Sequence, residues 1–75
     1  MASIREQKRS LTILGHRTSI SLEDAFWDGL KEIARSDGLT LPALVARIDA
    51  SRAGKGSLSS AIRVFVLERV RQKGA

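Results

Sequence analysis

The sequence contains no cysteine and a single histidine, His16. Disulfide bonds and thiolate metal sites are therefore excluded, and one imidazole does not make a His-rich metal site. No apolar run approaches the roughly 18 residues of a membrane-spanning helix, and no apolar segment of the secretory type follows Met1. We therefore expect no metal, no cofactor and no membrane span, and we expect the protein in the reducing cytoplasm.

The residue patterns of known catalytic sites are also missing. The chain has no glycine-rich phosphate loop and no GxSxG motif, and its acidic residues fall on the predicted solvent faces of helices. His16 has no serine and carboxylate at a spacing that indicates a catalytic triad. The sequence predicts a protein that is not an enzyme.

The chain is short and carries excess positive charge. Its 75 residues form one domain at most, and so small a domain buries little surface. Without disulfides or metals, association with a second copy is the remaining means of stabilisation. The net charge is +5, and the basic residues concentrate in residues 1–22 and 54–75 around an acidic middle. Two basic terminal segments favour a polyanionic partner, most often nucleic acid. The alternative is that these surface cations only keep the protein soluble.

The N-terminal third predicts an arm followed by one strand. Residues 1–9 are polar, basic and without period, which is typical of a flexible arm. Residues 16–22 alternate between polar and apolar side chains and predict a half-buried strand. Leu11 and Ile13 lie in the opposite phase, with Gly15 near the change, which indicates either one long bulged strand or a short strand behind an extended arm. Since no second strand pattern is found, the strand is expected to pair with a second copy.

Three helices are predicted after the strand, at about residues 23–37, 40–53 and 58–72. Gly38 stops the first helix, and Thr40 caps the second, whose first turn accommodates Pro42. Ser57 or Ser59 caps the third helix after a Gly-Lys-Gly break. Each helix carries an apolar stripe of the kind that packs against a core.

This order of one strand and amphipathic helices resembles the ribbon-helix-helix DNA-binding family. Residues 17–50, RTSISLEDAFWDGLKEIARSDGLTLPALVARIDA, carry the resemblance. It is similar in particular to small bacterial members that carry HRTSISLEDAFWDGLKEIA and a later LSSAIRVFVLERV segment. That likeness covers residues 10–72, and we expect a single domain there.

The resemblance implies a mostly α fold with one short β-strand, assembled as an intertwined homodimer. Strands of two copies would pair antiparallel into a ribbon above the helices, with a third helix added. The outward side chains Arg17, Ser19 and Ser21 would enter the major groove and contact bases, Arg17 discriminating most through paired bonds to guanine. Ser21 has a rival role as N-cap of the first helix. The implied dimer core consists of Thr18, Ile20, Leu22, Phe26, Leu30, Ile33, Leu44, Val45, Ile48, Ile62 and Phe65.

The family also holds a phosphate at the N-terminus of its second helix. Residues 40–53 are the preferred equivalent because they directly follow the first helix, although Pro42 removes one backbone donor. In the alternative, residues 39–53 are an insertion and residues 58–72 are the second helix. The expected phosphate contacts at this helix are Thr40 and Leu41 in the first assignment, and Ser57, Ser59 and Arg63 in the second. Arg9 in the arm and His16 on the strand are expected to contact phosphate as well.

The leading prediction is a dimeric, sequence-specific DNA-binding protein that regulates transcription. Two alternatives stay open. One is an antitoxin-like interaction module whose third helix binds a protein partner through Ile62, Phe65 and Val66. The other is a structural dimer of the same fold without DNA binding, because fold alone does not give function.

Overall fold

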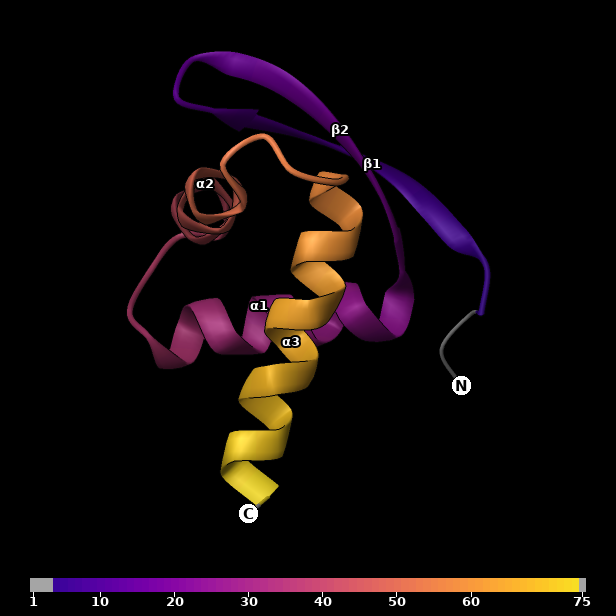
Figure 1. The fold of residues 1–75 in the computed structure, drawn as a ribbon, viewed down its shortest axis with the longest axis vertical. Helices are drawn as coiled ribbons and strands as arrows, with labels where there is room; N and C mark the ends of the chain where they lie inside the picture. Colours follow the sequence, from indigo (N-terminus) through magenta and orange to yellow (C-terminus); the bar gives the residue numbers. More distant parts are fainter. Residues whose placement is uncertain (1–3, 75) are drawn as a thin grey trace.

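The computed structural model describes residues 4–74 as a β-hairpin followed by three helices (Figure 1). The hairpin arches over one side of the helices, and α3 extends away from it toward the C-terminus (Figure 1). Each predicted helix, and the predicted strand, lies within two residues of its expected bounds. The elements are β1 (Glu6–Ile13), β2 (His16–Glu23), α1 (Asp24–Ser36), α2 (Leu41–Arg52) and α3 (Leu58–Gly74).

The strand β1 corrects two expectations. Residues 6–9, expected in a flexible arm, pair with residues 20–23 of β2, while residues 1–3 of that arm lie outside the described residues. The view that β2 has no partner in its own chain is wrong, since β1 pairs with it antiparallel along its whole length. The need for a strand partner therefore gives no reason for a second copy.

The turn between the strands explains the change of phase in the sequence. Ile13 pairs with His16, which leaves Leu14 and Gly15 as a two-residue loop. Their φ angles are +51° and +82°, as a type I′ turn requires. Residues 13 and 16 are cross-strand partners and lie on the same face of the hairpin. The inward-facing residues therefore have odd numbers in β1 and even numbers in β2. The change therefore marks a hairpin turn, and neither a bulged strand nor an extended arm is present.

The hairpin has one buried and one exposed face. Cross-strand partners project to the same side of a sheet. On the inner side, Ile13, Ile20 and Leu22 are buried, and Leu11 and Thr18 are half-buried. The outer side carries Lys8, Ser10, Thr12, Arg17, Ser19 and Ser21, all exposed, and the pair of Glu6 and Glu23 continues the same phase at the root of the hairpin.

The predicted N-cap residues are observed at two of the three helices. The Thr40 hydroxyl accepts a 3.2 Å hydrogen bond from the backbone N–H of Ala43 at the start of α2. The Ser57 hydroxyl accepts one of 3.1 Å from the N–H of Ser60 at the start of α3. At α1 the N-cap is Glu23, with no side-chain cap, so the rival role of Ser21 as N-cap is wrong.

The hydrophobic core is complete within one chain. Seven of the residues predicted for a dimer core are buried here, and the other four are partly buried. They pack beneath the hairpin and between the helices of the same chain. The buried core consists of Ile13, Ile20, Leu22, Leu30, Ala34, Leu44, Val45, Ile48, Ile62 and Val66.

Candidate nucleic-acid interface

The outer face of the hairpin is the strongest candidate site. The register places Thr12 opposite Arg17, Ser10 opposite Ser19, and Lys8 opposite Ser21. All six side chains are exposed, and each ends in a hydroxyl or a cation. Hydroxyls donate to and accept from base edges, and arginine forms paired bonds to guanine. The face therefore carries side chains that are able to contact base edges along both of its strands.

Three of the six exposed residues on this face belong to β1, and the sequence did not predict base contacts for them. Lys8 was expected in the arm, and Ser10 and Thr12 were not singled out. The signal that identifies them is the inward phase of Leu11 and Ile13, since their even-numbered neighbours must then point outward. The predicted readers Arg17, Ser19 and Ser21 do lie together on this face.

Negative charge is confined to the root of the hairpin. The segment between Glu6 and Glu23 contains no acidic residue. Both of these carboxylates contact Arg63, whose Nε donates a 2.9 Å hydrogen bond to Glu23. This hydrogen bond holds the pKa of the Glu23 carboxyl below its usual range. The outer face therefore carries no carboxylate between the root and the turn, and Arg63 is bound to the two carboxylates at the root rather than standing free for phosphate.

Arg9 lies on the inner side of the hairpin. It pairs with Ile20 across the strands, and its guanidinium carbon lies 4.7 Å from the centroid of the Trp27 ring. The same guanidinium forms an ion pair with Asp24, and only 25% of the side chain is exposed. Arg9, which was predicted to contact phosphate from a flexible arm, therefore joins β1 to the start of α1 on the inner side of the hairpin.

The remaining phosphate candidates are spread over the molecule. His16 is exposed beside the turn, and Thr40 is exposed at the start of α2 with its hydroxyl engaged as a cap. Leu41 packs against the core as a partly buried residue. Ser57 uses its hydroxyl to cap α3, and Ser59 in the next turn is half-buried.

The third helix has apolar residues both in the core and on its exposed surface. Ile62 and Val66 are buried against the core, so these residues are turned away from any partner. Val64, Leu67 and Val70 of the same helix are 54%, 52% and 58% exposed. Spacing of three residues places them along one face of the helix. We name this set the α3 stripe.

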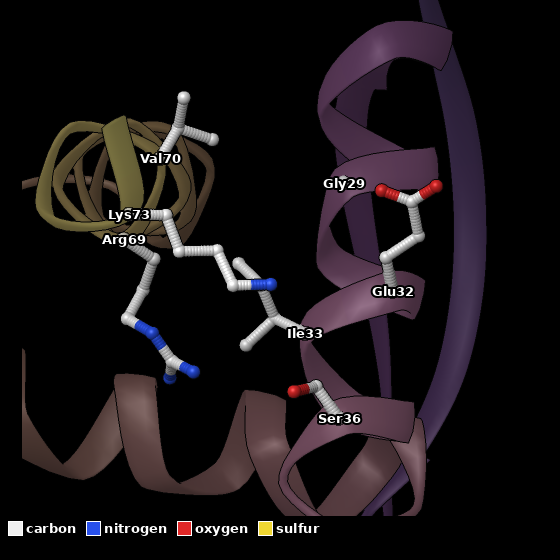
Figure 2. A pocket seen from close by; sticks show the side chains of 7 residues that line it. All are labelled: Gly29, Glu32, Ile33, Ser36, Arg69, Val70 and Lys73. Atoms are coloured by element: carbon white, nitrogen blue, oxygen red, sulfur yellow. The ribbon is translucent and has the colours of Figure 1, made fainter.

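A hollow lies between α1 and α3 (Figure 2). Arg69 at its rim forms a two-pronged pair with Asp37, with both distances 2.8 Å, which lowers the pKa of that carboxyl. Lys73 extends over the hollow toward Ile33 (Figure 2). The lining residues are Gly29, Glu32, Ile33, Ser36, Arg69, Val70 and Lys73.

The described part of the chain offers no metal site and no membrane span. Among residues 4–74, no three His, Asp or Glu side chains gather where they could hold a metal ion. None of the three helices is both long and apolar enough to cross a bilayer, within the residues that the structure describes.

A two-stranded ribbon with polar and cationic readers, carried on a small helical core, has the architecture of the β-ribbon class of DNA-binding domains. The sequence matches the ribbon-helix-helix domain family over residues 6–70, and the chain belongs to that family. Its members are generally DNA-binding transcription regulators. The matched range includes β1, α2 and most of α3. No curated protein and no solved structure matches the chain.

Proposed function

We propose that this protein is a sequence-specific DNA-binding regulator of transcription that reads the major groove with the outer face of its hairpin. The observation that carries the proposal is the composition of that face. Between the Glu6–Glu23 pair at the root and the turn, its six exposed side chains all end in a hydroxyl or a cation, and no carboxylate lies between Glu6 and Glu23 in the sequence. A two-stranded ribbon fits the width of the major groove, where each base pair presents a distinct pattern of donors and acceptors.

Within this proposal Arg17 is the principal base-reading residue. Its planar guanidinium suits the two acceptors of guanine, whereas Ser19 and Ser21 are short and permissive. Lys8 stands at the far end of the face, opposite Ser21. Four residues of strand separate the two cations, about 13 Å at the usual rise per residue. One hairpin would therefore contact about three to four base pairs at the rise of B-DNA.

The proposed functional unit is a homodimer, with an interface at α3 rather than a shared ribbon. The α3 stripe is an apolar surface on a helix whose other side already packs in the core. A protein of this size gains stability by covering such a surface. A two-fold axis would place the stripe of one copy against the same stripe of the other, because such an interface is isologous. Two hairpins would then read two half-sites of a palindromic operator.

The second copy is a better occupant of this surface than a foreign partner. The interaction-module alternative depended on Ile62, Phe65 and Val66, and these residues belong to the core of their own chain. Without those anchors the antitoxin-like function is not proposed. A structural dimer without DNA binding is instead one outcome of the experiment below.

Phosphate contacts belong in this proposal to His16 beside the turn and to backbone donors at the start of a helix. Thr40 and Leu41 stand at the start of α2, and Ser59 stands in the first turn of α3. Helix N-termini supply free N–H groups and positive potential. Such a regulator works beside the chromosome, so we place it in the bacterial cytoplasm.

Selection from a random pool of double-stranded DNA at near-physiological salt tests the proposal. We expect an enriched palindromic or tandem motif, bound with an affinity that falls steeply as salt rises. The slope of log K against log salt is about −0.9 for each phosphate that the protein neutralises in B-DNA. If the folded protein enriches no sequence and shows no salt-dependent binding, DNA recognition is rejected and the structural dimer remains.

A further inference from the structure

Leu14 at the tip of the hairpin occupies a position that does not suit a leucine. Its φ of +51° lies in the left-handed region, and its side chain is 86% exposed. The first position of a type I′ turn favours asparagine, aspartate or glycine. A Cβ atom in this conformation crowds the following carbonyl oxygen. The chain therefore keeps a strained residue here whose side chain does not contribute to the core.

The left-handed backbone and the high exposure of Leu14 together indicate that this side chain has a role other than stabilising the fold. A single exposed leucine is ordinary on a protein surface, and a left-handed residue is ordinary in a turn. A leucine that is both left-handed and almost fully exposed serves neither packing nor turn formation. Local strain at an exposed site that the fold does not need is a reason to look for a binding role.

The neighbours of Leu14 identify the kind of partner. Arg17 and Thr12 form the first outward pair beside the turn, and His16 is exposed next to the loop. No acidic residue lies in the hairpin closer to the tip than Glu6 and Glu23 at the root. The tip is thus an apolar group at the end of a cationic, hydroxyl-bearing face. The major groove offers one apolar feature beside its polar edges, the 5-methyl group of thymine.

We propose that Leu14 is a specificity-determining residue that packs against a thymine methyl group at one edge of the sequence read by Arg17. The inference rests on the proposed DNA-binding function and adds a readout to it. Arg17 would select its base through hydrogen bonds, whereas Leu14 would select a neighbouring thymine through burial of two apolar groups. The fold accepts the strain at the tip because the turn is held by the paired strands on both sides.

Two selections from one random DNA pool, with the wild-type protein and with Leu14→Asn, form the first part of the test. Asparagine suits the turn, so we expect the melting temperature of Leu14→Asn to rise by a few degrees. Both proteins should enrich the positions that depend on Arg17. Only the wild type should enrich thymine at a flanking position, and Leu14→Met, which keeps an apolar side chain, should retain that preference.

The second part removes the methyl group directly. Deoxyuridine replaces each thymine of the selected site in turn, which deletes one methyl group and keeps every hydrogen-bonding atom. For the wild type we expect one replacement to weaken binding about fourfold, the value of one buried methyl-sized group. Leu14→Asn should bind the two DNAs equally. Ile4→Asn is the matched control, because Ile4 is 93% exposed and precedes β1 at the other end of the hairpin.

The outcomes separate this inference from the function on which it rests. Equal binding of all deoxyuridine sites by the wild type would overturn the thymine contact while leaving DNA binding intact. A deoxyuridine effect that persists in Leu14→Asn would also overturn it, as would a change of oligomeric state in that variant, which would place Leu14 between copies of the chain. Absence of any DNA binding would instead reject the proposed function itself.

Discussion

Arg63 Nε donates a hydrogen bond of 2.9 Å to Glu23 Oε1, across 40 residues of sequence. The same guanidinium forms an ion pair with Glu6 at the start of β1. One side chain of α3 therefore holds both strands at the root of the hairpin, where β2 continues into α1. This contact ties the root of the hairpin to α3, and it predicts how the fold responds to acid.

We expect the protein to lose stability as the pH falls below about 4.5, the ordinary pKa of a glutamate. The hydrogen bond from Arg63 lowers the pKa of Glu23, and the paired bonds from Arg69 lower that of Asp37. The unfolded chain therefore takes up protons before the folded protein does, so this stabilisation is complete above the unfolded pKa and is lost as pH falls through the folded pKa. Thermal unfolding followed by circular dichroism between pH 3 and 7, about the range where carboxylates titrate, measures the effect.

The double variant Glu23→Gln and Asp37→Asn provides the comparison for that experiment. It removes both carboxylates with lowered pKa and keeps the size of each side chain. Its melting temperature should be lower than that of the wild type at neutral pH and should change less between neutral pH and acid. An identical pH dependence in the two proteins would show that other groups control acid unfolding.

Replacement of Arg9 by methionine should loosen β1 without changing which bases are preferred. Arg9→Met keeps an apolar stem against Trp27 but removes the ion pair with Asp24 and the cation over the ring. We expect a loss of about 1 kcal/mol, the usual size of a partly exposed cation–π contact. Urea unfolding measures this loss, with fluorescence of Trp27, the single tryptophan, as the probe. A changed DNA motif would instead place Arg9 at the DNA.

Replacement of Arg17 by alanine should weaken DNA binding and relax the base preference at one position of each half-site. A lost pair of bonds to guanine corresponds to about 1–3 kcal/mol of discrimination. Lys8→Ala should weaken binding less, because a single ammonium reads guanine with poorer geometry than a guanidinium. Arg35→Ala, an exposed cation of α1 away from the hairpin, is the control. Binding assays on the selected site and on single-base variants distinguish the three proteins. If Arg17→Ala kept the full base preference, the outer face would not be the reading surface.

A carboxylate in the middle of the α3 stripe should dissociate the proposed dimer. Leu67→Glu places two like charges close together across a two-fold axis, and burial of an unpaired carboxylate adds a further penalty. The side chain is 52% exposed in one chain, so the fold of the protomer should survive. Sedimentation equilibrium measures the mass, and circular dichroism checks the fold. Gln72→Glu adds the same charge to α3 outside the stripe and should leave the mass unchanged, whereas an unchanged mass in Leu67→Glu would remove the α3 interface.

Local sequence signals predicted the helices and β2 well. The alternation of polar and apolar residues from Arg17 onward predicts a half-buried strand and determines which of its side chains face the core. The caps at Thr40 and Ser57 mark helix starts through hydrogen bonds within four residues. These features depend on contacts between near neighbours. The structure therefore shows them close to where the sequence predicts them.

The strand β1 was missed because its signal is distributed and its turn is atypical. Residues 6–9 are polar, and the loop is Leu-Gly instead of the Asn-Gly or Asp-Gly that usually marks a two-residue hairpin. The sequence signal for β1 was the reversed phase of Leu11 and Ile13. This phase indicates a second strand only when both strands are taken to pack against the same core. The sequence did not place Lys8, Ser10 and Thr12 on the outer face for the same reason.

The sequence by itself determined the helices, the apolar stripes and the alternating face of β2, because each follows from periodicity or from contacts along a few residues. It indicated the family through the resemblance of residues 17–50. The tertiary structure decided that β1 pairs with β2 in the same chain, so that one protomer presents a complete ribbon. It also decided which cations face outward, since Arg9 and Arg63 are engaged by Trp27 and by acidic side chains from other parts of the chain. Charge along the chain cannot show this, because pairing depends on distances that only packing sets.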